Sequence, residues 1–188
     1  DIVTSGLSNK INKQQVDWIK SPLGIDGTLM YRQKTGKTGM YKLFGTFNNS
    51  TSEMFYPNTQ LGTIQDISLN SSNVYLNNTF NSQLGEKWMV KSGLAFNYDN
   101  QNIDLDKDRI VTNQKMVQAK FGFSHFLNEQ TELKLGADWV NFSYEQKVKM
   151  NGNFQLPFTN NELSGFAEME YKLSKKFATR LGFRAENS

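Results

Sequence analysis

Apolar and polar residues alternate with a period of two along most of the chain. In residues 115–127 the odd positions are almost all apolar, whereas the even positions carry mostly polar residues and glycine. The odd positions after Lys115 are Val117, Ala119, Phe121, Phe123, His125 and Leu127. Such a regular period of two indicates a β-strand with one apolar face and one polar face.

Other segments repeat this alternation, and short polar turns join several of them. The predicted strands cover approximately residues 11–20, 28–34, 38–48, 73–81, 88–98, 115–127, 132–144, 163–173 and 177–186. We therefore predict an all-β fold: an antiparallel up-and-down meander of about nine strands.

The alternation changes phase once, near Trp139 and Val140. In residues 133–139 the odd positions are apolar, whereas in residues 140–144 the even positions are apolar. A β-bulge would produce this change, because it inserts one extra residue into a strand. Passage of the strand out of an apolar layer would produce it as well.

The predicted connections alternate between short turns and long polar loops. The short turns are 35–37, 82–86, 128–130 and 174–176, and the long loops are roughly 49–72, 99–112 and 147–160. Bacterial outer-membrane barrels have short turns at one end and long loops at the other. Their tilted strands need about 9–11 residues to cross the apolar layer, so we predict part of a transmembrane outer-membrane β-barrel. A soluble sheet that buries its apolar faces against each other is the alternative fold.

Composition supports a single-layer sheet more than a thick core. Hydrophobic residues make up 37% of the 188 residues and aromatic residues 13%. No run approaches the roughly 18–20 apolar residues of a transmembrane helix. The net charge of +3 is spread along the chain, which does not indicate a nucleic-acid-binding tail. Cysteine is absent, which excludes disulfides and Cys-ligated metals.

The chain is expected to be a single barrel segment, 1–188, truncated at both ends. An odd strand number does not match single-chain bacterial barrels, which have an even number. The first residues contain no signal peptide, and the last ones, 184–188, lack a terminal aromatic residue.

Four stretches resemble a known family. Residues 16–22 (VDWIKSP) and 30–40 (MYRQKTGKTGM) resemble the mid-barrel of Bacteroidetes-type TonB-dependent outer-membrane receptors. Residues 165–173 (GFAEMEYKL) and 181–188 (LGFRAENS) resemble the recurring hairpin of those receptors. The plug domain and the TonB box of the family have no counterpart in this sequence.

The resemblance implies a segment of a receptor in the bacterial outer membrane that takes up a siderophore, an oligosaccharide or a peptide. It further implies a barrel of about 22 strands that encloses a plug, with energy supplied through TonB. The implied partners are outer-membrane lipid, the plug domain, TonB and a small solute. The alternative is a non-transporting outer-membrane β-barrel protein with adhesive or structural loops.

Charged residues on two neighbouring predicted strands suggest a lumen-facing network. Its members are Glu168, Glu170, Arg180, Arg184 and Glu186. Catalytic carboxylate pairs of glycosidases flank a sugar, whereas adjacent carboxylates beside arginines indicate an ion-pair ladder. The chain has one histidine, which leaves little for a multi-histidine metal site or a Ser-His triad. We therefore predict no enzymatic activity and no cofactor.

A second candidate site is an acidic stretch in a predicted loop. Asp104, Asp106 and Asp108 have the D-x-D-x-D spacing that opens a calcium-binding loop. Arg109 stands where such a loop requires glycine, and Lys115 where it requires glutamate. An EF-hand is therefore excluded, and an irregular cation site or a solvated acidic loop remains.

Overall fold

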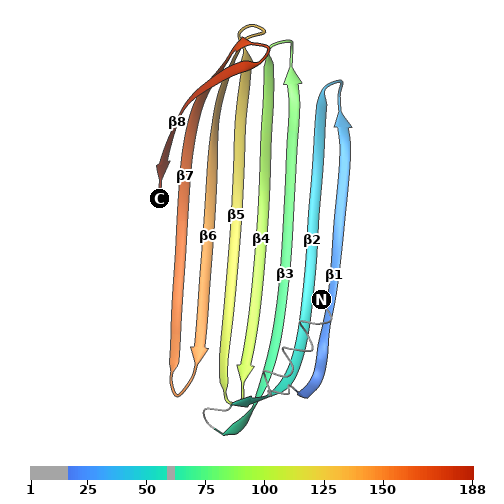
Figure 1. The fold of residues 1–188 in the computed structure, drawn as a ribbon, viewed down its shortest axis with the longest axis vertical. Coiled ribbons are helices and arrows are strands. Elements are labelled where there is room, and N and C mark those ends of the chain that lie inside the picture. Colours follow the sequence, from blue (N-terminus) through green and yellow to red (C-terminus); the bar gives the residue numbers. More distant parts are fainter. Residues whose placement is uncertain (1–16, 59–61) are drawn as a thin grey trace.

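In the described residues, 17–58 and 62–188 of a computed structural model, the chain forms one antiparallel sheet in which each strand pairs with the next along the sequence (Figure 1). The eight strands of this described part are β1 (Asp17–Thr35), β2 (Gly39–Asn58), β3 (Thr63–Leu84), β4 (Trp88–Leu105), β5 (Asp108–Phe126), β6 (Thr131–Lys149), β7 (Asn153–Ser174) and β8 (Phe177–Asn187). None of these residues lies in a helix that could cross a membrane. The predicted all-β meander is confirmed.

The strand number differs slightly from the sequence expectation of about nine. Of the segment predicted at 11–20, residues 11–16 lie outside the described residues, and residues 17–20 open β1. The short turns are confirmed. Three residues connect the strands at 36–38 and at 85–87, four at 127–130 and two at 175–176.

The prediction of three long polar loops is wrong. β4 and β5 are separated only by residues 106–107, and β6 and β7 only by residues 150–152. β2 likewise extends to Asn58, and β3 begins at Thr63. Seven strands have 18–22 residues, about twice the 9–11 needed to cross a membrane.

These long hairpins persist because polar side chains pair across the strands. The Thr51 hydroxyl donates to the Asn70 side chain at 2.6 Å, and the Asn100 amide donates to Asn113 at 2.6 Å. Asn and Ser favour turns, which is why sequence alone predicted loops. Directly opposite partners in a ladder also stabilise a sheet, and here this effect prevails. We call residues 48–58 with 62–73, 99–114 and 141–161 the distal hairpins.

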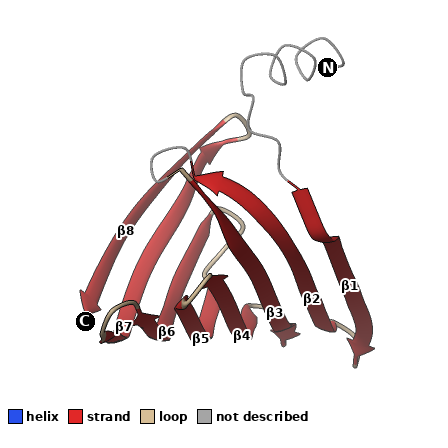
Figure 2. Cartoon of the chain, turned by 90° about the horizontal axis from the view of Figure 1, so that it is seen from below, coloured by secondary structure: helices blue, strands red, loops and turns tan. Residues whose placement is uncertain are grey.

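The sheet is curved into an arch (Figure 2), and its two faces differ in polarity. Between the short turns and the distal hairpins, the register places most apolar residues of the strands on one face; for example, Phe123 lies opposite Leu135, which lies opposite Ala167. This face is exposed, with Leu135 at 56% and Leu181 at 73%. The buried non-glycine residues of the described part all belong to the opposite face. They are Ala95, Ser124 and Ser164. The polar face is therefore the concave one.

We call the apolar side chains of the convex face, which are exposed or half-buried, the apolar band. Its members include Leu29, Tyr31, Leu43, Phe47, Val74, Leu76, Leu94, Phe96, Val117, Phe121, Phe123, Leu133, Leu135, Trp139, Leu163, Met169, Leu181 and Phe183.

Polarity exchanges between the two faces where the distal hairpins begin. The pairing of β6 with both neighbours runs through residues 139–140 without a register shift, which excludes the bulge. Beyond this level the concave face becomes mainly apolar on β6 and β7, and one register row further out is apolar across β7 to β3. That row consists of Phe154, Val148, Ile110, Ile103 and Leu69. The convex face becomes polar there; for example, the Asn141 amide donates to Asn161 at 2.6 Å. The phase change marks the edge of the apolar band.

Gly136 is predicted to be a position where even one methyl group is costly. A Cβ at this position would overlap the Phe166 ring and lie 2.8 Å from the backbone oxygen of Phe121. At Gly122 the nearest atom would be 3.5 Å away, an ordinary contact. Overpacking of this kind costs about 1–3 kcal/mol. We expect Gly136→Ala to lower the free energy of unfolding of the membrane-inserted protein by this amount in urea titrations, and Gly122→Ala to cost much less. Equal costs would contradict the close contact with Phe166.

Candidate functional site

An ion-pair network lies on the concave face where β7 and β8 pair. Arg180 stands directly opposite Glu170 in the register, and its Nη2 atom lies 2.8 Å from Glu170 Oε2. The Arg180 Nε atom is 3.9 Å from Glu168 Oε2. Glu168 and Glu170 are two residues apart on an extended strand, so both side chains project from one face. The structure thus brings three of the predicted network residues together.

The network continues onto β6 through a lysine that sequence reasoning did not select. Lys134 Nζ lies 3.4 Å from Glu170 Oε2 and 3.4 Å from Glu132 Oε2. Its side chain is 25% exposed. Lys134 and Glu132 occupy the polar positions of a predicted strand, so the alternation that placed them on this face was visible in the sequence. Their strand partner was not, because sequence does not give register.

Arg184 and Glu186 form a separate pair along β8. The Arg184 guanidinium donates to the Glu186 carboxylate, and its Nη2 atom donates to the Ser164 hydroxyl at 2.9 Å. Among the described residues, no ion pair joins Arg184 or Glu186 to Arg180.

A third group surrounds Asp138 on β6. Its carboxylate, 13% exposed, lies 3.4 Å from Lys120 Nζ and accepts a hydrogen bond from the Gln118 amide at 3.2 Å. Sequence reasoning also missed this group, whose members come from two strands. Each carboxylate of the three groups has a cationic partner. These carboxylates are Glu132, Asp138, Glu168, Glu170 and Glu186. Four of these pairs link neighbouring strands at the concave face.

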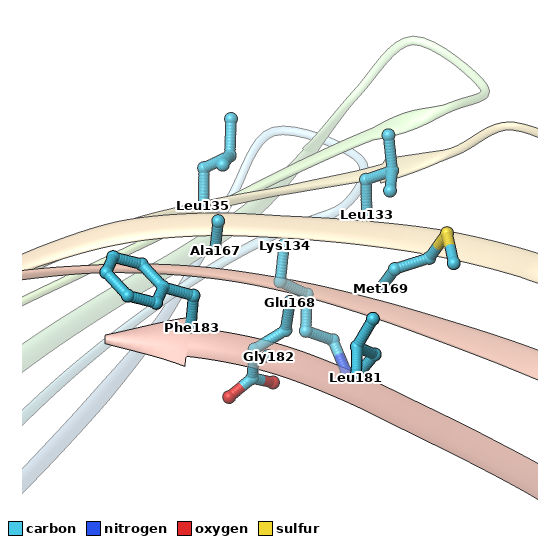
Figure 3. A pocket seen from close by; sticks show the side chains of 9 residues that line it. All are labelled: Leu133, Lys134, Leu135, Ala167, Glu168, Met169, Leu181, Gly182 and Phe183. Atoms are coloured by element: carbon cyan, nitrogen blue, oxygen red, sulfur yellow. The ribbon is translucent and has the colours of Figure 1, made fainter. Parts of the chain in front are cut away.

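The opposite face of the same strands carries a shallow hollow of about 470 Å³ (Figure 3). Apolar side chains of β6, β7 and β8 surround it, whereas Glu168 points away to the other side of the sheet. The apolar residues that line it are Leu133, Leu135, Ala167, Met169, Leu181 and Phe183. A hollow with such a lining suits a hydrocarbon chain better than a polar ligand.

Aromatic residues lie near both borders of the apolar band. Close to the short turns, the rings of Trp88 and His125 are 4.1 Å apart between centroids. At the other border, Lys115 lies 5.8 Å from the Tyr98 ring centroid. Tyr144, by contrast, lies on the concave face opposite Phe158.

The three aspartates of the candidate cation site are placed differently from one another. Asp104 forms an ion pair with Arg109 at 3.3 Å, on the convex face. Asp106 lies in the turn with φ 54° and accepts a hydrogen bond from the Asp66 backbone N–H at 2.8 Å. Asp108 pairs with Leu105, on the concave side. In the described part of the chain, no three His, Cys, Asp or Glu side chains are grouped to hold a metal ion.

A single-layer, curved antiparallel meander with an apolar convex face and a polar concave face is the wall of an outer-membrane type of β-barrel. No family model matches the sequence, and no curated protein matches it. Among solved structures, the fold is similar to that of the ferric yersiniabactin uptake receptor FyuA from Yersinia pestis, with a TM-score of 0.56 and 11% identity. The similarity covers 86% of this chain and 27% of FyuA. The chain thus has the fold of a segment of a receptor barrel and spans about a quarter of that receptor's length.

The geometry predicts that Asp106 stabilises the hairpin turn directly. Asp tolerates φ > 0, and the Asp106 carboxylate accepts a hydrogen bond from the Asp66 backbone N–H, which ties the turn to β3. We therefore expect Asp106→Ala to speed proteolysis at residues 106–107. Asp104→Ala, which removes only an exposed ion pair, serves as the control and should have a smaller effect. Calcium or a chelator should not change cleavage of the unsubstituted protein. Protection by calcium that is lost in both variants would instead establish a cation site.

Proposed function

We propose that this chain is part of the barrel wall of a Bacteroidetes-type TonB-dependent receptor in the bacterial outer membrane. The receptor would take up a siderophore, an oligosaccharide or a peptide. The resemblance of residues 30–40 and 165–173 to this family supports the proposal. The fold likeness to FyuA, an uptake receptor, independently supports the coarser part of the proposal, a segment of a receptor barrel.

The exchange of polarity along single strands is the observation that carries the proposal. Within the apolar band, Leu135 faces outward and its neighbour Lys134 faces the concave side. In the distal hairpins this order is reversed, with Val148 on the concave side and Lys147 on the convex side. Hydrocarbon surrounds a barrel only over a band about 25 Å tall. A soluble sheet has no reason to reverse its faces at one common level.

The proposal also assigns the two ends of the sheet. Outer-membrane barrels have their short turns in the periplasm and their longer segments outside the cell. The turns at 36–38 and 85–87 would therefore lie in the periplasm, and the distal hairpins would project from the cell surface. A plug inside the barrel and TonB at the periplasmic side are the expected partners.

If the convex face contacts lipid, the loss of unfolding free energy caused by an arginine substitution should depend strongly on which face carries it. Arginine at a lipid-facing position near the bilayer midplane costs about 2–4 kcal/mol, so Leu135→Arg should lower the free energy of unfolding by that amount. Asn77→Arg, on the concave face of β3, is the matched control and should be nearly neutral. The measurement is urea unfolding of the full-length protein inserted in phospholipid vesicles. Similar costs for both variants, or a cooperatively folded monomer in buffer without detergent, would refute the membrane assignment.

Transport can be tested with a strain that lacks the gene encoding this chain. We expect the strain to lose growth on one scarce iron chelate, oligosaccharide or peptide, because passive porins do not admit such large solutes efficiently. Removal of TonB should give the same defect, and the complete gene should restore growth only when TonB is present. Unchanged uptake combined with lost surface adhesion would favour the non-transporting alternative.

A further inference from the structure

The charges on the concave face are not equally neutralised across the sheet. On β6, β7 and β8 each carboxylate of the three groups above has a cationic partner. On β1, β2 and β4, by contrast, four cations have no carboxylate within 4.0 Å among the described residues. These four residues, which we call the basic strip, are Arg32, Lys34, Lys42 and Lys91.

The register brings the basic strip together on one face. Arg32 and Lys42 stand directly opposite each other, and Lys34 follows Arg32 on the same face. Lys34 and Lys91 share one register row, which runs from Lys34 through Met40 and Asn81. Like charges directly opposite each other destabilise a sheet. The wall therefore carries an unfavourable arrangement that an anionic partner would relieve.

The basic strip faces away from the apolar band. The residues that alternate with it, Tyr31 and Leu43, stand opposite each other on the convex face. The four cations are exposed, but on the concave side, where lipid headgroups around the outer wall do not reach. Their partner must therefore be inside the arch.

The width of the strip indicates what kind of anion fits it. From β1 to β4 there are three interstrand steps of about 4.8 Å, which gives about 14 Å. One small anion cannot contact cations spread over this distance, whereas several carboxylates on a protein surface can. On β6 to β8 the wall supplies its own carboxylates, so a charged partner has less to gain there.

We propose that the basic strip is the docking surface for an acidic face of a folded domain seated inside the barrel. This inference rests on the proposed function, because a plugged receptor contains such a domain. It adds which part of the wall holds that domain and which charge the domain presents. The charges on β6 to β8 act within the wall instead.

Zero-length carbodiimide coupling tests the docking directly, because it joins lysine to a carboxylate only at contact distance. The full-length receptor in isolated outer membranes is coupled, digested and examined by mass spectrometry. We expect links from Lys34, Lys42 or Lys91 to Asp or Glu outside this sheet. Lys134 should couple to Glu170, which lies 3.4 Å away and is the internal positive control. A Lys134–Glu170 link without any link from the basic strip would overturn the proposal.

Charge reversal supplies the second test. The Arg32→Glu/Lys42→Glu variant should loosen the internal domain and raise its rate of proteolysis in intact membranes about tenfold, as expected for lost charge pairs at an interface. The matched control, Lys107→Glu/Lys149→Glu, changes the charge equally on the distal hairpins and should leave proteolysis unchanged. Equal proteolysis in the two variants would contradict the docking.

The outcomes also separate this inference from the proposed function. A rise in the KM for solute uptake, without coupling and without altered proteolysis, would mean that the strip binds an anionic solute and would overturn the inference alone. Intact TonB-dependent uptake with no coupling from the strip would do the same. A full-length protein that forms an open pore without an internal domain would overturn both proposals.

Discussion

The continuous register of the antiparallel ladder is the constraint on which the rest of the structure depends. A shift by one residue would move every side chain of a strand to the other face. From β2 to β7 the pairing runs without a register shift over the whole length of the strands. A single-layer sheet has no second layer against which a mispaired strand could pack. The position of each apolar and charged group therefore follows from this pairing.

Continuous register also explains how one strand can serve two environments. Because the pleat does not change at Trp139 and Val140, the sequence itself must exchange polarity when its surroundings change. On the side of the short turns the concave face is polar and the apolar band lies on the convex face. On the side of the distal hairpins, Asn141 and Asn161 bond to each other on the outer side, while Phe142 and Phe158 lie 6.3 Å apart on the inner one. The level at which the surroundings of the strand change is therefore visible in the sequence, as a change from odd to even apolar positions.

Much of this architecture could be predicted from alternation alone. The period of two identified the strands, the short turns and the two faces, because each depends only on near neighbours in sequence. The distal hairpins could not be predicted, since Asn70 and Asn113 favour turns unless a partner strand supplies Thr51 and Asn100. The charge network was predicted only where both strands had been recognised as one hairpin. Lys134 was missed because its partner Glu170 is 36 residues away.

The distribution of charge on the concave face separates groups that hold the wall together from groups that remain available. Glu170 is already shared between Arg180 and Lys134, so binding a new partner there would first require an existing pair to be broken. Among the described residues, Arg32 and Lys42 have no such pair to lose, and an approaching anion would relieve the repulsion between them. A concave wall with ion pairs on β5 to β8, and with the unpaired cations of the basic strip among the described residues of β1, β2 and β4, would therefore favour one orientation of a charged partner. Electrostatic complementarity of this kind contributes more to orientation and specificity than to raw affinity.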